Sequence, residues 1–121
     1  MPKKKKAKLT RASKQEALVV FFTTFDSRED AHKFARTLVQ QRLAACVQVI
    51  PHITSFYSWQ NEMHEAPELL CIGKTTVSGF KRLAKEIKKY HTYKLPELVA
   101  LPLAGAYGPY AQWVRMGVGK T

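Results

Sequence analysis

Cysteine is scarce in this sequence of 121 residues, and long apolar runs are absent. The two cysteines, Cys46 and Cys71, lie in apolar surroundings, which argues against a secreted disulfide scaffold and indicates a reducing compartment. The longest apolar run, near residues 17–22, is far too short to span a membrane, and no signal-peptide core follows the basic N-terminus. We therefore expect a cytoplasmic protein that has no membrane partner.

Catalytic signatures are also missing. The sequence has no glycine-rich phosphate loop, no G-x-S-x-G elbow, no H-E-x-x-H motif and no C-x-x-C pair. Its nine acidic residues include no close pair placed for glycosidase-type acid and base catalysis. The four histidines and two cysteines lack zinc-finger spacing. The sequence therefore predicts a protein that is not an enzyme.

Positive charge is what the sequence has in excess, with a formal net charge of +11. Residues 1–16 hold seven lysines and arginines against one glutamate, and almost no large apolar side chains. This composition predicts a disordered basic tail over residues 1–16 and a folded domain over residues 17–121. The lysine run suits either a solubilising tail or an arm that contacts nucleic acid.

The rest of the chain alternates between strand-like and helix-like patterns. Stretches rich in β-branched and aromatic residues predict four strands, over residues 17–25, 43–59, 62–76 and 96–103. Apolar residues recurring at three- and four-residue steps predict three helices, over residues 28–42, 77–90 and 107–116. The order is that of a ferredoxin-like α+β sandwich, β-α-β-β-α-β, with an added C-terminal helix.

The second and third strands predict an unusually long hairpin that turns at residues 60–61. Pro51 lies inside it and predicts a bulge or bend, because proline cannot donate to a strand ladder. The outer end carries Phe56, Tyr57 and Trp59, which a monomer would not easily cover. Such an exposed aromatic end indicates assembly with other subunits.

The same turn predicts a register for the hairpin. Position 46 then faces position 75, and position 50 faces position 71. Cys46 and Cys71 would share a face but lie about four residues, or roughly 13 Å, apart. That separation is too large for a disulfide or for one shared ion within a monomer. A bulge at Pro51 would change this register.

Several ordered motifs over residues 17–116 resemble the CutA family of divalent-cation-tolerance proteins. In chain order the matching segments are residues 44–47 (AACV), 50–51 (IP), 55–59 (SFYSW), 68–75 (ELLCIGKT), 91–97 (HTYKLPE), 100–102 (ALP) and 110–113 (YAQW). Thr92 stands where the family usually has proline, and Gly73 interrupts the apolar strand before Lys74.

The resemblance implies a homotrimer in which the long hairpins of three subunits pack around an axis, with Phe56, Tyr57, Trp59 and Trp113 in the subunit contacts. It also implies a role in tolerance of divalent metal ions, copper especially. A likeness to PII-type signalling trimers places ligands in clefts between subunits. The alternative function is a trimeric protein-binding scaffold, or a PII-like signalling module, with incidental metal affinity.

Site residues are implied by the same resemblance. Cys46 matches the cysteine of the AACV segment and is the candidate ligand for copper, as Cu(I) or Cu(II), with His91 as a secondary candidate. Lys74, Tyr93 and Glu97 match polar positions that would approach the cleft between subunits. Purely structural roles are the alternatives: an ion pair between Lys74 and Glu97, and a helix C-terminus capped by His91.

Overall fold

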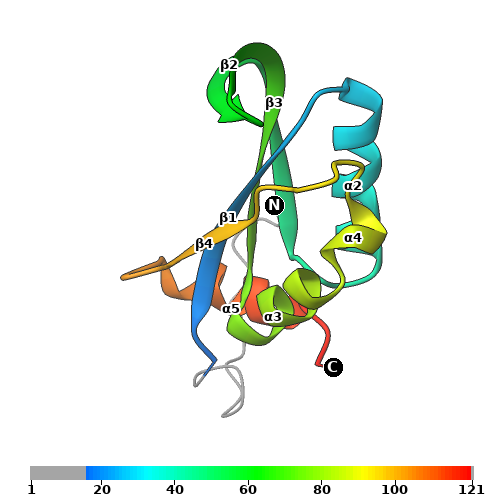
Figure 1. Cartoon of the computed structure of the whole chain (residues 1–121). Helices are drawn as coiled ribbons and strands as arrows, with labels where there is room; N and C mark the ends of the chain where they lie inside the picture. The colour runs from blue at the N-terminus through cyan, green and yellow to red at the C-terminus, as the bar shows by residue number, and fades with distance from the viewer. Residues whose placement is uncertain (1–15, 121) are drawn as a thin grey trace.

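The computed structural model describes residues 16–120 (Figure 1). Its strands are β1 (Leu18–Phe25), β2 (Cys46–Trp59), β3 (Glu62–Thr76) and β4 (Val99–Pro102). Its helices are α2 (Arg28–Gln40), α3 (Val77–Lys85), α4 (Ile87–Tyr90) and α5 (Gly108–Gly117). The predicted α+β fold is confirmed, whereas the predicted tail lies outside the described residues except for Glu16.

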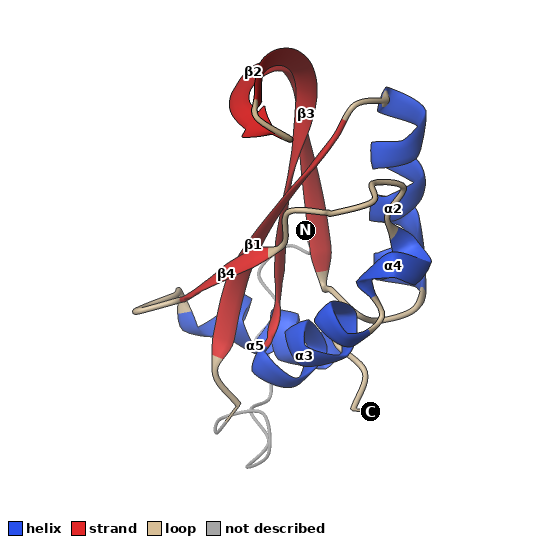
Figure 2. Cartoon of the chain, in the orientation of Figure 1, coloured by secondary structure: helices blue, strands red, loops and turns tan. Residues whose placement is uncertain are grey.

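The four strands form one antiparallel sheet in the order β2-β3-β1-β4. This is the order of a ferredoxin-like sheet, in which each βαβ unit leaves room for a strand of the other unit. Helices and sheet form separate layers, and the β2–β3 hairpin extends beyond the helices and curls at its tip (Figure 2). In the described part of the chain, no helix is long and apolar enough to cross a membrane.

Polar caps decide where the first two helices begin. Ser27 caps α2, because its side chain accepts a hydrogen bond of 3.1 Å from the backbone N–H of Asp30. The cap of α3 is Thr76, whose hydroxyl accepts a hydrogen bond of 3.1 Å from the backbone N–H of Gly79. The helix predicted over residues 77–90 is divided at Glu86, where φ is −115°.

The predicted hairpin is confirmed, but its register is not. Gln60 and Asn61 form the turn with φ of 52° and 66°, and Trp59 pairs with Glu62. The ladder shifts between Ile50 and Ile53, so that position 46 pairs with position 74 instead of 75. The physical reason is a bulge at Pro51-His52, where His52 takes a φ of 63°.

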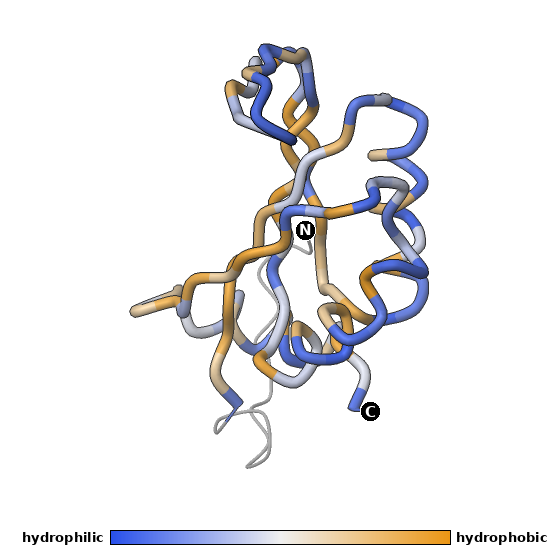
Figure 3. The backbone as a smooth tube through the Cα atoms, in the orientation of Figure 1, coloured by the Kyte–Doolittle hydropathy of each residue, from blue (hydrophilic) through white to orange (hydrophobic). Residues whose placement is uncertain are grey.

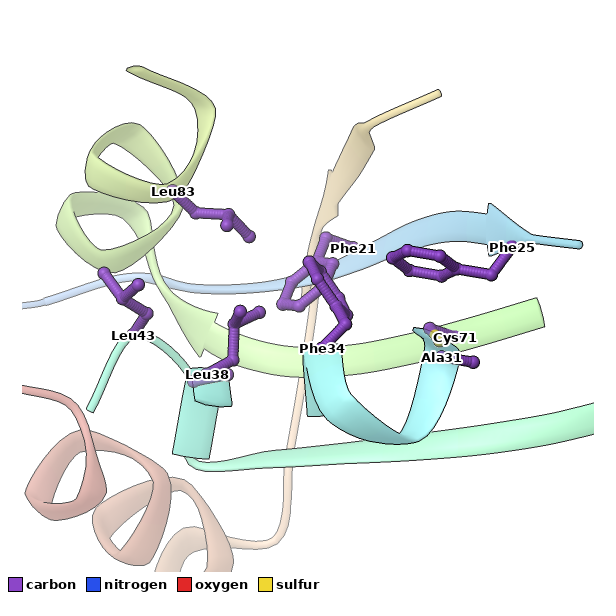
Figure 4. Packing of buried hydrophobic residues seen from close by; sticks show 9 residues of the cluster. Phe21, Phe25, Ala31, Phe34, Leu38, Leu43, Cys71 and Leu83 are labelled. Carbon is purple, nitrogen blue, oxygen red and sulfur yellow. The ribbon is translucent and has the colours of Figure 1, made fainter. Parts of the chain in front are cut away.

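The main core lies between the sheet and the helices α2 and α3 (Figure 4). Its largest fully buried side chains come from β1, α2 and α3: Phe21, Phe25, Phe34, Leu38 and Leu83. Gly73 is required here, because a Cβ at that position would lie 2.1 Å from the ring of Phe21 on the paired strand. The sequence departure at Gly73 therefore makes room for an aromatic ring.

The opposite face of the sheet is apolar but has no helix over its centre. Strand alternation and register place seven apolar residues there, which we call the bare sheet face: Val20, Phe22, Ile50, Leu70, Ile72, Val99 and Leu101. Helix α5 packs at one end of this face, against Leu18 and Ala45. Figure 3 shows how strongly apolar β1 and β4 are along their length.

Candidate ligand groove and cysteine site

A groove of about 960 Å³ lies between the curled hairpin tip and the segment that leads into β4. Phe56, Tyr57 and Trp59 line it from β2, while Tyr93 and Glu97 line it from the opposite side. The three aromatic side chains are 64%, 46% and 38% exposed in the protomer. The groove thus combines a broad apolar wall with a few polar groups, as small-molecule sites commonly do.

A buried hydrogen bond fixes the polar part of the groove. The hydroxyl of Tyr93 donates to Oε2 of Glu68, whose side chain is almost wholly buried. Burial and this hydrogen bond both raise the pKa of the Tyr93 phenol, so the hydroxyl remains a donor. Glu68 was not among the predicted site residues, although it begins the matching segment 68–75, because the sequence gave no sign that its side chain meets Tyr93.

His91 positions Tyr93 from beneath. Its Nε2 lies 2.8 Å from the carbonyl oxygen of Thr24, and its Nδ1 accepts a hydrogen bond of 3.1 Å from Tyr93 N. The imidazole must therefore be the neutral tautomer that carries its proton on Nε2. Burial lowers the pKa of His91, and its ring stacks on Phe25 at 3.9 Å.

The sequence-predicted cleft residues are divided between two places. Tyr93 and Glu97 both line the groove of the protomer. Lys74 does not: it pairs with Cys46 in the β2–β3 ladder, and its ammonium group donates to Oε1 of Gln48 at 2.5 Å. No Lys74–Glu97 ion pair is found in residues 16–120.

Cys46 lies at the start of β2, away from the groove. Its Sγ is 3.5 Å from the hydroxyl of Tyr110, and burial together with this neighbour raises the pKa of Tyr110 to about 12. Tyr110 in turn stacks on Trp113, with ring centroids 5.6 Å apart. Trp113 is therefore placed beside the cysteine rather than with the aromatic residues of the hairpin tip.

Cys71 is on the other face of the sheet, which corrects the prediction that the two cysteines share one. The one-residue shift at Pro51-His52 pairs Cys71 with Val49, so that Cys71 points into the core and is fully buried. Burial raises the pKa of its thiol to about 11. Both cysteines are free thiols.

Metal ligands are sparse within one protomer. Among residues 16–120, no group of three or more histidine, cysteine or acidic side chains is close enough to hold a metal ion. Both ring nitrogens of His91 are already hydrogen-bonded. In this part of the chain Cys46 is the cysteine that lies outside the core, and it is not surrounded by a cluster of such ligands.

Comparison with known proteins agrees with this arrangement of strands and motifs. Residues 19–116 match the model of a protein family described as the CutA1 divalent ion tolerance protein. The chain belongs to the CutA1 family. A CutA relative from Thermus thermophilus is 44% identical over 100 residues, which cover 83% of this chain and 97% of the relative.

A longer relative and a solved structure also match this chain as CutA proteins. The chloroplastic CutA of Arabidopsis thaliana is 34% identical, and the match covers 89% of this chain but 59% of that protein. The solved structure of the CutA1 from Thermus thermophilus has a TM-score of 0.81 and 43% identity, covering 84% of this chain and 99% of that one. The chain thus spans nearly the whole bacterial relative and about three-fifths of the plant one.

Proposed function

We propose that this member of the CutA1 family acts as a homotrimer in divalent metal ion tolerance, with no enzymatic activity. The observation that carries the proposal is the bare sheet face, where Ile50, Val99 and Leu101 are 43%, 51% and 58% exposed in the protomer. An apolar sheet face continued by an aromatic hairpin tip is typical of a subunit interface. Two free cysteines are in keeping with a cytoplasmic location.

Assembly would complete both candidate sites. The groove beside Tyr93 and Glu97 is open on the side of the hairpin aromatics, so a second subunit would turn it into a cleft that holds a small ligand. Copper would need a second soft donor next to Cys46, since even a linear Cu(I) site has two ligands. We propose that this donor comes from another subunit.

The assembly is tested by the mass of the intact particle. Sedimentation equilibrium of the full chain at micromolar concentration should give three times the monomer mass of 13.8 kDa. Leu101→Asp, on the bare sheet face, should shift this mass towards the monomer. Val39→Asp is the matched control, because Val39 is similarly exposed, at 43%, but lies on α2. A monomeric wild-type protein would refute the trimer.

Copper is tested by anaerobic competition titration of the wild type, Cys46→Ser and Cys71→Ser. Cys46→Ser should lose at least tenfold in Cu(I) affinity, while Cys71→Ser should keep it, since Cys71 is enclosed in the core. The affinity for Cu(I) should also weaken as the pH is lowered, because protons compete for the thiolate. Equal affinity of Cys46→Ser and wild type would favour the alternative, a trimeric scaffold or PII-like module with incidental metal affinity.

A further inference from the structure

We propose that the outward side of the helical layer binds the phosphate backbone of double-stranded nucleic acid without sequence preference. The residues concerned are five exposed cations of α2, α3 and α4, which we call the basic helical face: Lys33, Arg36, Lys81, Lys85 and Lys89. The proposal is independent of the metal and trimer proposals, because this side lies across the domain from the bare sheet face.

Charge is segregated within the domain. Residues 28–40 and 77–90, which form the helical layer, contain eight lysines and arginines against three acidic residues, a net charge of +5. The four strands contain Lys74 against Glu62, Glu65 and Glu68, a net charge of −2. Backbone traces coloured by hydropathy show α2 and α4 as largely hydrophilic (Figure 3). Excess positive charge therefore faces outward on one side.

Most of these cations are not neutralised by neighbours. In the described part of the chain a single ion pair is found, between Lys89 and Glu86 at 3.7 Å. Lys33, Arg36 and Lys81 thus have no carboxylate partner within 4 Å. Lys88 is left out of the face because its ammonium group donates to the carbonyls of residues 93 and 94, at 2.6 and 2.8 Å.

The basic helical face contains a recess between α2 and α4. It has a volume of about 360 Å³, and Lys33 and Lys89 line it together with the polar side chains of Thr37 and Gln41. Paired lysines on the two sides of a polar recess suit a phosphate group, which lysine binds as a point charge. Asp30 also lines the recess and opposes anion binding there.

The sequence that precedes the described residues is also rich in positive charge. By sequence, residues 1–15 contain seven lysines and arginines and no acidic residue. Glu16 is joined to this layer, because its carboxylate accepts from the hydroxyl of Ser78 in the first turn of α3.

Apolar side chains decide between nucleic acid and a lipid surface. A helical face that enters a membrane interface needs large apolar residues beside its lysines. On α2, α3 and α4 the one large apolar residue that is exposed is Val39. None of the aromatic rings of these helices is fully exposed: Phe80 and Tyr90 are half-buried, and the Tyr90 ring lines the recess with Lys89 Nζ 5.8 Å from its centroid, so it is not a free platform for stacking unpaired bases. Of the three candidate partners, a duplex bound through its phosphates fits this surface best.

The test is fluorescence anisotropy of the full chain with a labelled 20-base-pair DNA duplex. Binding should weaken about 100-fold between 50 and 200 mM NaCl, as expected for some four phosphate contacts, and two duplexes of unrelated sequence should bind equally. Lys81→Gln/Lys85→Gln should weaken binding about tenfold and reduce the logarithmic salt slope by about 2. Lys74→Gln/Lys94→Gln removes the same charge elsewhere and should change affinity less than twofold.

Three outcomes would overturn the proposal. One is equal loss in the two double variants, which would mean attraction to net charge alone. The second is unchanged binding by Lys81→Gln/Lys85→Gln, with all affinity lost on changing Lys3, Lys4, Lys5 and Lys6 to Gln in the full chain. The third is tighter binding to vesicles containing 30% phosphatidylserine, or to polyglutamate, than to the duplex at the same salt concentration.

Discussion

The two faces of the sheet are built from similar side chains but have different neighbours. Phe21 and Phe22 are adjacent in β1, yet Phe21 is fully buried against α2 and α3 whereas Phe22 belongs to the bare sheet face. Cys71 and Cys46 are divided in the same way, one within the core and one next to Tyr110. Alternation along a strand thus separates residues that stabilise the protomer from those available for assembly and ligands.

Replacing Phe21 and Phe22 in turn should give the largest difference between the two faces of the sheet. Phe21→Ala should destabilise the protein by about 3–5 kcal/mol, because it leaves a cavity in a closed core. Phe22→Ala should cost much less in the protomer, and its effect should depend on protein concentration, since it acts through assembly. Chemical denaturation at two protein concentrations measures both. Equal, concentration-independent losses would show that the two faces are equivalent.

A smaller change tests how closely the sheet packs against α2 and α3 on its core side. Gly73→Ala should destabilise by about 1–3 kcal/mol, because the added methyl group meets the ring of Phe21 and neither can move freely. Thermal unfolding of the variant gives the loss. Gly105→Ala is the control, since a Cβ at Gly105 meets no atom within 4 Å. If Gly73→Ala is no worse than this control, Phe21 repacks without cost.

The sequence predicted the fold well because periodicity depends on which side of each element is buried. The four strands and the helical segments were found from alternation and helical spacing, and the 60–61 turn was placed correctly, but the break between α3 and α4 was not predicted. Boundaries were less accurate: the last strand was predicted over residues 96–103 but covers Val99–Pro102. Residues 96–98 line the groove instead of extending the ladder, and Leu103 packs against the cluster that includes α5.

The site was predicted only in part, because the positions of its residues depend on the strand register and on the shape of the hairpin. Pro51 predicted a bulge. The single-residue shift that separates Cys46 from Cys71 also depends on the positive φ of His52, and a histidine in the sequence does not indicate a positive φ. Lys74 was grouped with Tyr93 by motif, although the strand ladder carries it towards Cys46. The buried Glu68–Tyr93 pair could not be recognised without knowing how the hairpin curls.

Acidification should distinguish a buried histidine, His91, from a half-buried one, His32. Burial lowers the pKa of His91, so below its ordinary value of 6.5 the unfolded chain takes up a proton that the folded protein does not. Stability should therefore be complete above pH 6.5 and fall as the pH decreases below it, by at most about 1.4 kcal/mol per pH unit for this one proton. Urea unfolding at pH 7.5, 6.0 and 5.0 measures the fall.

Two variants show whether His91 is responsible for that dependence. His91→Gln removes the titrating ring and should flatten the difference between pH 7.5 and pH 5.0, even though its stability at pH 7.5 is lower. His32→Gln changes a histidine of α2 outside the core and should leave the wild-type difference intact. A His91→Gln protein with the full pH dependence would assign the effect to other groups.

The smallest effect is expected at the outer surface of the helical layer, where the side chains of Glu86 and Lys89 are exposed and do not pack in the core. Lys89 and Glu86 form an ion pair of 3.7 Å with side chains 69% and 51% exposed, so water screens their attraction. Glu86→Gln should change the free energy of unfolding by less than about 0.5 kcal/mol. The same change releases Lys89 and should tighten binding of the DNA duplex about twofold, which anisotropy at 50 mM NaCl would detect. Unchanged stability with no gain in duplex binding would show that Lys89 does not contact phosphate, and would confine the basic helical face to α2 and α3.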